Sequence, residues 1–478
     1  MNHPVSIKTP AIGESSELLQ LFENQQQAVL ANGAPTYKQR IAALDALLHM
    51  IKSNYGLLID TVSADFGNRS SAETQLSELM PIVNGIKHVR SSLKSWMRPS
   101  KRKVGIAFRP ASAKVMYQPL GVVGILAPWN YPLTLTLVPL MEALAAGNRV
   151  MIKPSELTPR TAELLKRLLS ETFPADQVAV VTGDAALAGR FSELAFDHLL
   201  FTGSTNVGRH VMAAAARNLT PVTLELGGKS PVIVSADFPL EKAARLIAIG
   251  KFFNAGQTCV APDYVLVPRH LLDTFAAELL SATKTLYPTI EGNQDYTSIV
   301  SQRHYDRLVK MIEQASACGS RIWQHGINSA ADERKIPPTI LTNVSLEADV
   351  MLEEIFGPLL PVIPYDSKEQ AIAFINYRPK PLALYCFSNS RSFVDLVLEQ
   401  TRSGGVTING TMLHATQDDL PFGGVGSSGT GAYHGYEGFV RLSHARGVFK
   451  LSRFNMSDKV SAPYGAMTRL VTRLMLGK

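Results

Sequence analysis

Cysteine is scarce in this chain. Its 478 residues include only Cys259, Cys318 and Cys386, which are too few and too widely spaced for a disulfide framework or a metal knuckle. This scarcity favours a reducing compartment, so we expect a cytoplasmic protein without a metal site. Long hydrophobic runs are also missing from the first thirty residues, which carry several glutamates. Neither a signal peptide nor a membrane span is expected there.

No sign of charge dominates the chain. The 47 Lys and Arg residues exceed the 40 Asp and Glu residues by a net charge of only +7, and 46% of the residues are hydrophobic. This balance is typical of globular proteins and excludes a disordered or fibrous class. The densest basic cluster, Lys101-Arg102-Lys103 with Arg98 and Arg109, has no interleaved aromatic residues. We interpret it as a solvated surface, and we expect no nucleic-acid partner.

The distribution of apolar residues indicates an α/β fold. Residues 15–97 are rich in Leu, Ala, Gln and Lys with few glycines, which predicts helices. From Val115 onward, short apolar runs alternate with helical stretches, which predicts a parallel sheet covered on both faces, the usual platform for a dinucleotide. The apolar runs are 122–126, 150–152, 178–181 and 198–201, and the helical stretches include 161–172 and 207–218.

Cys259 is the most informative single residue. It follows Gly256-Gln257-Thr258, where a glycine lets a substrate approach the backbone and a thiolate can attack a carbonyl carbon. Upstream, Glu225 ends a short apolar run before two glycines. A glutamate alone is most often a surface acid or a structural partner of a basic group. Paired with a nucleophilic cysteine, it suits acyl chemistry, because a carboxylate can activate the water that hydrolyses a thioester.

Four further segments accompany these two residues in a fixed order. They are 127–132 (APWNYP), 152–156 (IKPSE), 201–208 (FTGSTNVG) and 353–358 (EEIFGP). Together with the cysteine and glutamate segments, they resemble the NAD(P)-dependent aldehyde dehydrogenases over about residues 117–438. The segments 130–132, 420–424 and 433–435 look most similar to the class 3 branch of that family. Within that branch, the bacterial coniferyl aldehyde dehydrogenases look most similar.

Two glycine-rich segments compete for a phosphate site. The only G-x-G-x-x-G match, 424–429, has no apolar strand before it and no helical pattern after it, so we interpret it as a glycine loop. The segment 203–208 follows an apolar run and opens a helix, which favours either a pyrophosphate site or an ordinary Ser/Thr N-cap. The resemblance favours the first of these, with Gly203, Ser204 and Gly208 in the matching positions.

The resemblance also implies the other cofactor contacts. It places Lys153 and Glu156 at the adenosine ribose, Glu354 at the nicotinamide ribose, and Phe356 and Trp129 beside it. A carboxylate at the adenosine ribose favours the free hydroxyl of NAD over the charged phosphate of NADP, although class 3 relatives accept both.

A four-step mechanism follows from the resemblance. Cys259 attacks the aldehyde, Asn130 and the backbone N–H of Cys259 stabilise the oxyanion, hydride passes to NAD(P)+, and Glu225 activates water to release the acid. From the residues alone, Asn130 is equally a turn residue before Tyr131-Pro132. The substrate is predicted to be an aromatic aldehyde such as coniferyl aldehyde, or a medium-chain or long-chain aliphatic aldehyde.

Two other functions stay open at this point. An acyl-transferring or reductive member of the superfamily would pass the acyl group to or from coenzyme A or phosphate, and such enzymes tend to lack the base, so Glu225 argues against it. A noncatalytic binding or structural protein would tolerate loss of the thiol. The presence of Cys259, Glu225 and Asn130 together argues against that role.

The resemblance implies an aldehyde dehydrogenase-like fold with three parts. A Rossmann-type cofactor domain is expected at 1–97 and 119–226, and a second α/β domain, carrying the catalytic cysteine, at 227–430. A bridging strand element is expected at 98–118 and 441–452. In the family this element pairs subunits, which implies a homodimer.

The last segment, 453–478, is predicted to be an amphipathic tail. Apolar residues recur in it at helical spacing, and Arg469, Arg473 and Lys478 supply positive charge. The apolar face of this helix has two interpretations. It docks on the protein's own surface, which is the interpretation we favour, or it makes peripheral contact with an anionic membrane. The apolar residues are Met467, Leu470, Val471, Leu474 and Met475.

Overall fold

The N-terminal region is helical, as the sequence predicts. The computed structural model describes residues 12–326, 333–453 and 460–477. Helix α2 begins with a capping box, in which Thr36 and Gln39 satisfy each other's backbone N–H groups. The helices are α1 (Ile12–Asn32), α2 (Tyr37–Ser53), α3 (Tyr55–Phe66), α4 (Ser71–Thr74) and α5 (Met80–Trp96), with a π-helical turn η1 (Gln75–Leu79) before α5.

The first sheet contains the predicted strand-and-helix alternation. Strands β3 to β7 are parallel, and the strand order is β15-β7-β6-β3-β4-β5, with β15 antiparallel to β7. The strands are β3 (Val122–Leu126), β4 (Arg149–Lys153), β5 (Val178–Val180), β6 (His198–Thr202), β7 (Val222–Glu225) and β15 (Gly429–Thr430). The helices between them are α6 (Thr134–Ala146), α7 (Pro159–Thr172), α8 (Ala185–Ser192) and α9 (Thr205–Ala216).

Helices cover both faces of this sheet, which explains its continuous apolar runs. Val123 and Ile125 of β3 join the large core that includes α2, α5, α6 and α7. Val122 and Leu126 of the same strand join a smaller core with residues of α1, α8 and α9. Asn130 and Glu156 lie in the loops at the carboxyl ends of β3 and β4, and the 203–208 segment runs from the end of β6 into the first turn of α9.

The second sheet has seven strands in the order β10-β11-β12-β9-β8-β13-β14, and only β10 is antiparallel to its neighbour. Its strands are β8 (Pro231–Val234), β9 (Tyr264–Pro268), β10 (Arg321–Gln324), β11 (Thr339–Thr342), β12 (Leu359–Tyr365), β13 (Ala383–Phe387) and β14 (Gly405–Ile408). Its helices are α10 (Leu240–Phe252), α11 (Leu272–Leu286), α12 (Gln302–Ala317), α13 (Asp349–Leu352), α14 (Lys368–Tyr377) and α15 (Arg391–Gln400). The proposed domain limits stay a prediction. Strand β15 lies at the end of the range predicted for the second domain, but it pairs with β7 of the first sheet.

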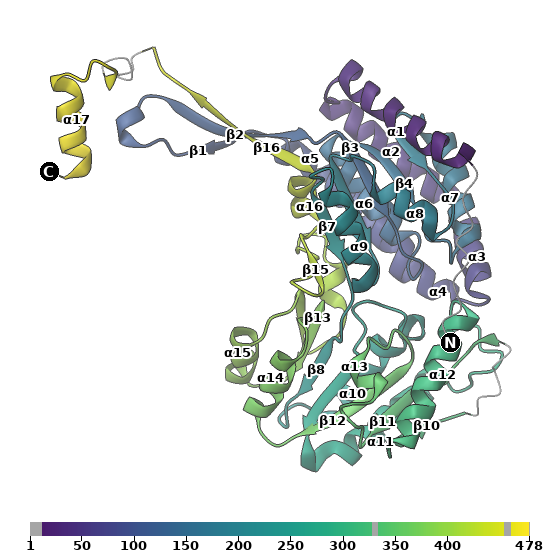
Figure 1. Ribbon diagram of the computed structural model, residues 1–478. Helices are drawn as coiled ribbons and strands as arrows, with labels where there is room; N and C mark the ends of the chain where they lie inside the picture. Colours follow the sequence, from purple (N-terminus) through teal and green to yellow (C-terminus); the bar gives the residue numbers. More distant parts are fainter. Residues whose placement is uncertain (1–11, 327–332, 454–459, 478) are drawn as a thin grey trace.

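A three-stranded antiparallel sheet forms where the bridging element is predicted. We call it the arm, and it consists of β1 (Ser100–Arg102), β2 (Ser112–Pro119) and β16 (Ser443–Lys450), in the order β1-β2-β16. Helix α16 (Gly435–Arg441) leads into β16. Figure 1 shows the arm projecting away from the two larger sheets. Its role in pairing subunits stays a prediction.

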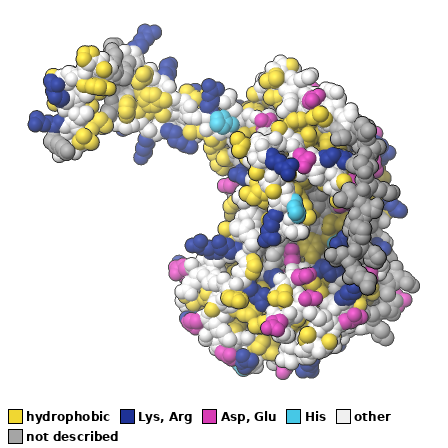
Figure 2. Space-filling model, viewed as in Figure 1, with side chains coloured by type: hydrophobic (Ala, Val, Ile, Leu, Met, Phe, Trp, Pro, Cys, Tyr) yellow, Lys and Arg dark blue, Asp and Glu magenta, His cyan; other side chains and the backbone are white. Residues whose placement is uncertain are grey.

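The tail forms the predicted helix, but it does not dock as we expected. Helix α17 (Ala466–Leu476) has no buried residue, and Leu474 is 74% exposed. It stands at the end of the arm, away from the body (Figure 1), where hydrophobic and basic side chains share the visible surface (Figure 2). Docking on the chain's own surface is therefore wrong for the single chain. Among the described residues, no helix is long and apolar enough to cross a membrane.

Candidate active site

The loop that carries Cys259 has an unusual backbone. After α10 ends, Asn254 and Ala255 have φ values of 51° and 50°, and Gly256 has a φ of 74°. A side chain at Gly256 would collide with the carbonyl group of Gly357, so only glycine fits there. Left-handed non-glycine residues are strained, and such strain persists only where the surroundings hold the backbone in place.

Gln257 supplies much of that support. Its side-chain amide donates to the carbonyl oxygens of Asn254 and Ser298, both at 3.0 Å, and its side-chain oxygen accepts from the Val300 N–H at 3.0 Å. From the first helical region, the buried Glu73 accepts from the Asn254 N–H at 3.1 Å. The motif around Cys259 therefore fixes the loop as well as providing the thiol. No local pattern pointed to Glu73, because it lies far from the loop along the chain.

Asn130 lies directly against this loop. Its side-chain amide donates to the Gln257 carbonyl oxygen at 3.2 Å, and its own carbonyl oxygen accepts from Arg69 at 3.0 Å and from Asn254 at 3.1 Å. Arg69 is fixed in turn by a fully buried ion pair with Glu78, at 3.1 Å. An amide group has two N–H donors, so the bond to Gln257 occupies one of them.

Two carboxylates lie within electrostatic range of the thiol. Burial, followed by the charges of Glu354 and Glu225, raises the pKa of Cys259 to about 12. Glu354 lies against Gly227, where any side chain would collide with its carboxyl oxygens. Burial, followed by the charge of Asp263, raises the pKa of Glu354 to about 8, while the Gly228 N–H opposes the rise. In this state the thiol is protonated and weakly nucleophilic.

Glu225 is almost completely buried, at 2% exposure. Burial and the nearby Glu142 raise the pKa of Glu225 well above its ordinary value, and Arg441 opposes the rise. Neither of its carboxylate oxygens has a hydrogen-bond partner within the described part of the chain. The structure thus places the predicted base within electrostatic range of Cys259, in surroundings that favour its protonated form.

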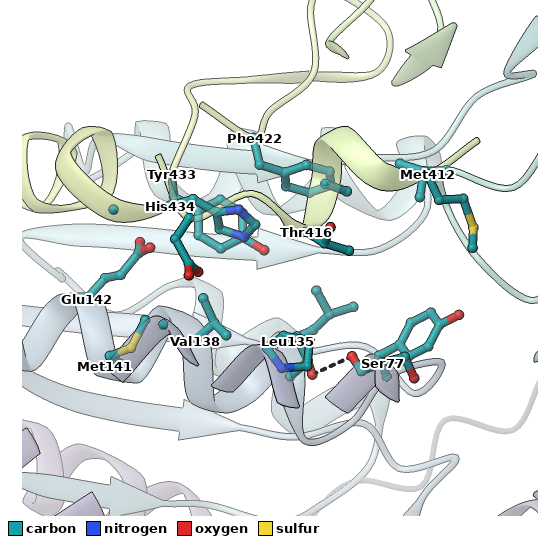
Figure 3. Close-up of a pocket in the computed structure, with 18 of the residues that line it drawn as sticks. Ser77, Leu135, Val138, Met141, Glu142, Met412, Thr416, Phe422, Tyr433 and His434 are labelled. Carbon is teal, nitrogen blue, oxygen red and sulfur yellow. Dashed lines mark hydrogen bonds between the residues drawn. The ribbon is translucent and has the colours of Figure 1, made fainter. Parts of the chain in front are cut away.

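Cys259 opens into a mainly apolar pocket between the two larger sheets. Figure 3 shows Leu135 and Val138 of α6 along one side and Phe422 and Tyr433 along the other. Apolar lining residues include Pro81, Val89, Leu135, Val138, Met141 and Phe422. Glu225 and Asn130 do not line this pocket, although both lie near the cysteine loop. The pocket suits an aldehyde with a sizeable apolar body.

A second, larger cleft brings together most of the predicted cofactor residues. It is lined by Trp129, Lys153, Glu156, Gly203 and Ser204. The buried Lys153 and the half-exposed Glu156 form an ion pair at 2.7 Å. Ser204 is the N-cap of α9, where its hydroxyl accepts from the Val207 N–H at 3.4 Å. The structure therefore shows the ordinary N-cap, and it also places that helix start in the cleft, where backbone N–H groups suit a phosphate.

The remaining predicted cofactor residues lie beside the cleft. Gly208 is buried where a side chain would overlap Leu226, so it lets α9 pack closely. The Phe356 ring is 5.3 Å from the Trp129 ring and inclined to it by 73°. The 424–429 glycine loop does not line the cleft, in agreement with its interpretation as a loop.

The sequence analysis missed a basic face of α12. Arg303, Arg307 and Lys310 all line the same cleft as Lys153 and Ser204. Arg307 also donates to the carbonyl oxygens of Glu354 and Ile355, at 3.4 and 2.5 Å, and so fixes the segment that carries Glu354. Their spacing of four and three residues on one helical face was a signal that could have found them. The structure gives this cleft positive charge, which suits an anionic cofactor.

Comparison with known proteins decides the family. The model of the aldehyde dehydrogenase family matches residues 6–448. The chain belongs to the aldehyde dehydrogenase family. The resemblance seen in the sequence is therefore confirmed, together with the α/β fold class. This aldehyde dehydrogenase oxidises aldehydes to carboxylic acids with a nicotinamide cofactor.

Three similar proteins support this assignment. A probable coniferyl aldehyde dehydrogenase from Pseudomonas aeruginosa is 51% identical over 464 residues, 97% of each chain. Aldehyde dehydrogenase family 3 member A2 from Pongo abelii is 40% identical, over 88% of this chain and 86% of its own length. The solved structure of the substrate-bound state of Staphylococcus aureus AldH has a TM-score of 0.90 and 37% identity, and the match covers 96% of this chain and 99% of that one. None of these matches favours the acyl-transferring or noncatalytic alternatives.

Proposed function

We propose that this enzyme oxidises an aromatic aldehyde of the coniferyl type to its acid through a thioester on Cys259, with NAD+ as the preferred cofactor. The observation that carries the proposal is the position of Cys259, which opens into an apolar pocket and lies within electrostatic range of Glu225 and Glu354. The name of the similar Pseudomonas aeruginosa protein supports the substrate class.

The proposed chemistry begins when the Cys259 thiol loses its proton to solvent and the sulfur forms a bond to the aldehyde carbon, as the carbonyl π electron pair moves onto the oxygen. The negative charge on the former carbonyl oxygen is stabilised by N–H groups of the Asn130 side chain and the Cys259 backbone. A nicotinamide held in the neighbouring cleft would supply the hydride acceptor, and loss of hydride from the carbon bonded to Cys259 would leave a thioester. Glu225 then takes a proton from water, the hydroxide attacks the thioester, and the carboxylic acid leaves as the thiol re-forms.

The hydrogen-bond donors that line the second cleft suit a dinucleotide cofactor. Ser204 and the backbone N–H groups that open α9 would hold the pyrophosphate, and Lys153 with Glu156 would hold the adenosine ribose. Glu354 would hold the nicotinamide ribose, with Trp129 and Phe356 beside it. The carboxylate of Glu156 would repel the 2′-phosphate of NADP+, which supports NAD+ as the preferred cofactor. The basic face of α12 lines the same cleft and would attract that phosphate, which supports NADP+ as a second cofactor.

We expect Glu156→Gln to shift cofactor preference toward NADP+. Loss of the carboxylate removes its repulsion of the 2′-phosphate, and for a half-exposed group the ratio of kcat/KM for NADP+ to that for NAD+ should rise roughly twofold to fivefold. Glu163→Gln, an exposed carboxylate outside the cleft, serves as the control for net charge. An unchanged ratio in Glu156→Gln would place this residue away from the ribose.

The assembly and location also belong to this proposal. A homodimer through the arm and a cytoplasmic location are supported by the resemblance and by the low cysteine content. Because α17 has no buried residue, we now favour peripheral contact of this basic amphipathic helix with an anionic membrane.

Removal of residues 464–478 should separate the interpretations of the tail. We expect the melting temperature to change by less than about 2 °C, because no buried contact is lost, and co-sedimentation with phosphatidylserine vesicles to disappear. Replacing Arg469 and Arg473 by Gln keeps the apolar stripe and should weaken the same binding, as should high salt. A larger fall in melting temperature with unchanged lipid binding would instead indicate docking on a protein surface.

A further inference from the structure

The pocket of Cys259 has a polar end that the mechanism does not use. Glu142 lines the pocket and is 1% exposed. Among the described residues, neither of its carboxylate oxygens has a hydrogen-bond partner of ordinary geometry, although the backbone N–H groups of His434 and Gly435 face it. The Nε2 atom of His88, another lining residue, also lacks a partner there. Asp418 lines the same end of the cavity.

Glu142 lies at a definite distance along the pocket. Leu135, Val138 and Met141 lie on the pocket side of α6, and Glu142 follows them. At about 1.5 Å per residue, Glu142 is about 10 Å along the helix axis from Leu135. Figure 3 shows Glu142 at one end of the pocket near His434, and Met412 and Ser77 at the other. The lining between these ends is mainly apolar.

Among the described residues, no side chain bonds to this carboxyl group, and the groups that face it are the backbone N–H groups of His434 and Gly435 at the start of α16. An unpartnered buried polar group costs roughly 1–3 kcal/mol, whereas an apolar side chain would fill the same position without that penalty. The surroundings nevertheless keep room for it, because a side chain at Gly438 would collide with its oxygens. Burial, with smaller contributions from the charges of Asp418 and Glu437, raises the pKa of Glu142 well above its ordinary value, while the facing backbone N–H groups of His434 and Gly435 oppose the rise. A neutral carboxyl group can both donate and accept a hydrogen bond.

We propose that Glu142 selects aromatic aldehydes that carry a hydroxyl group on the ring, by hydrogen bonding to that hydroxyl at the polar end of the pocket. The inference rests on the proposed function and adds the substrate feature that the pocket recognises. A site built to bond a substrate hydroxyl rejects the analogue without it, because the buried polar group is then left unpaired.

The test compares 4-hydroxycinnamaldehyde with cinnamaldehyde, which differ only in the ring hydroxyl. We expect the wild-type enzyme to have a kcat/KM at least about tenfold higher for the hydroxylated aldehyde. In Glu142→Leu this ratio should fall to about one, and in Glu142→Gln, which keeps hydrogen-bonding atoms, it should fall less. Glu437→Gln removes a nearby carboxylate that does not line the pocket, and it should keep the wild-type ratio.

Each outcome has a distinct meaning. A wild-type enzyme without preference for the hydroxylated aldehyde overturns the Glu142 inference, even if the variants do not fold. Equal losses on both aldehydes in Glu142→Leu and Glu142→Gln also overturn it, and would indicate that Glu142 acts on Glu225 instead. A wild-type enzyme that oxidises short aliphatic aldehydes but neither aromatic one contradicts the proposed function itself.

Discussion

Cys259→Ser should lower kcat for aldehyde oxidation by roughly 10⁴-fold to 10⁶-fold, the size of loss that follows removal of a covalent nucleophile. A serine hydroxyl at neutral pH is a far weaker nucleophile than a thiolate. NAD+ binding should be nearly unchanged, because Cys259 lines the substrate pocket and not the cofactor cleft. Steady-state NADH formation and calorimetric titration with NAD+ measure the two effects.

The matched control is Cys318→Ser, which replaces an exposed thiol that lines neither the substrate pocket nor the cofactor cleft. Its kcat should equal that of the wild-type enzyme. If Cys259→Ser kept most of its activity, or if Cys318→Ser lost a comparable amount, Cys259 would not be the nucleophile.

Glu225→Gln should separate the two halves of the reaction. Acylation and hydride transfer do not require the base, so a burst of about one NADH per active site should remain in stopped-flow measurements. The steady-state rate should fall by roughly 10²-fold to 10⁴-fold, because the thioester forms and then persists. A burst that falls in proportion to the steady-state rate would show that Glu225 acts before the thioester forms.

The raised pKa of Glu225 also predicts how this step depends on pH. A general base works only when deprotonated, so turnover should increase as pH rises through that elevated pKa. The same increase should be absent from Glu225→Gln, because glutamine does not titrate. The comparison is made on the steady-state rate under conditions where deacylation limits turnover.

Much of the site could be predicted because chemistry fixes local sequence. The cysteine loop needs glycine at a left-handed position, and the nucleotide cleft needs a strand followed by a helix start, so both leave patterns within a few residues. The strands of the first sheet were predictable for a similar reason. Helices cover both faces of that sheet, which makes each strand a short uninterrupted apolar run.

The parts that were missed depend on contacts between distant segments. Glu142 is one acid within a helix, and its burial arises only because α5 and α16 pack against α6. Glu73 reaches the Asn254 N–H from the first helical region. For the tail, an apolar stripe predicts a helix but does not identify the surface that covers it, so the docking prediction failed.

The central claim is a covalent thioester on Cys259, and the most direct test is mass spectrometry of the trapped intermediate. Glu225→Gln is mixed with NAD+ and 4-hydroxycinnamaldehyde, quenched in acid after the NADH burst, and digested. The account predicts that the acyl group is found on the peptide that contains Cys259, in amounts equal to the NADH released. A full burst with no acyl group on that peptide, or with the acyl group on another residue, would contradict it.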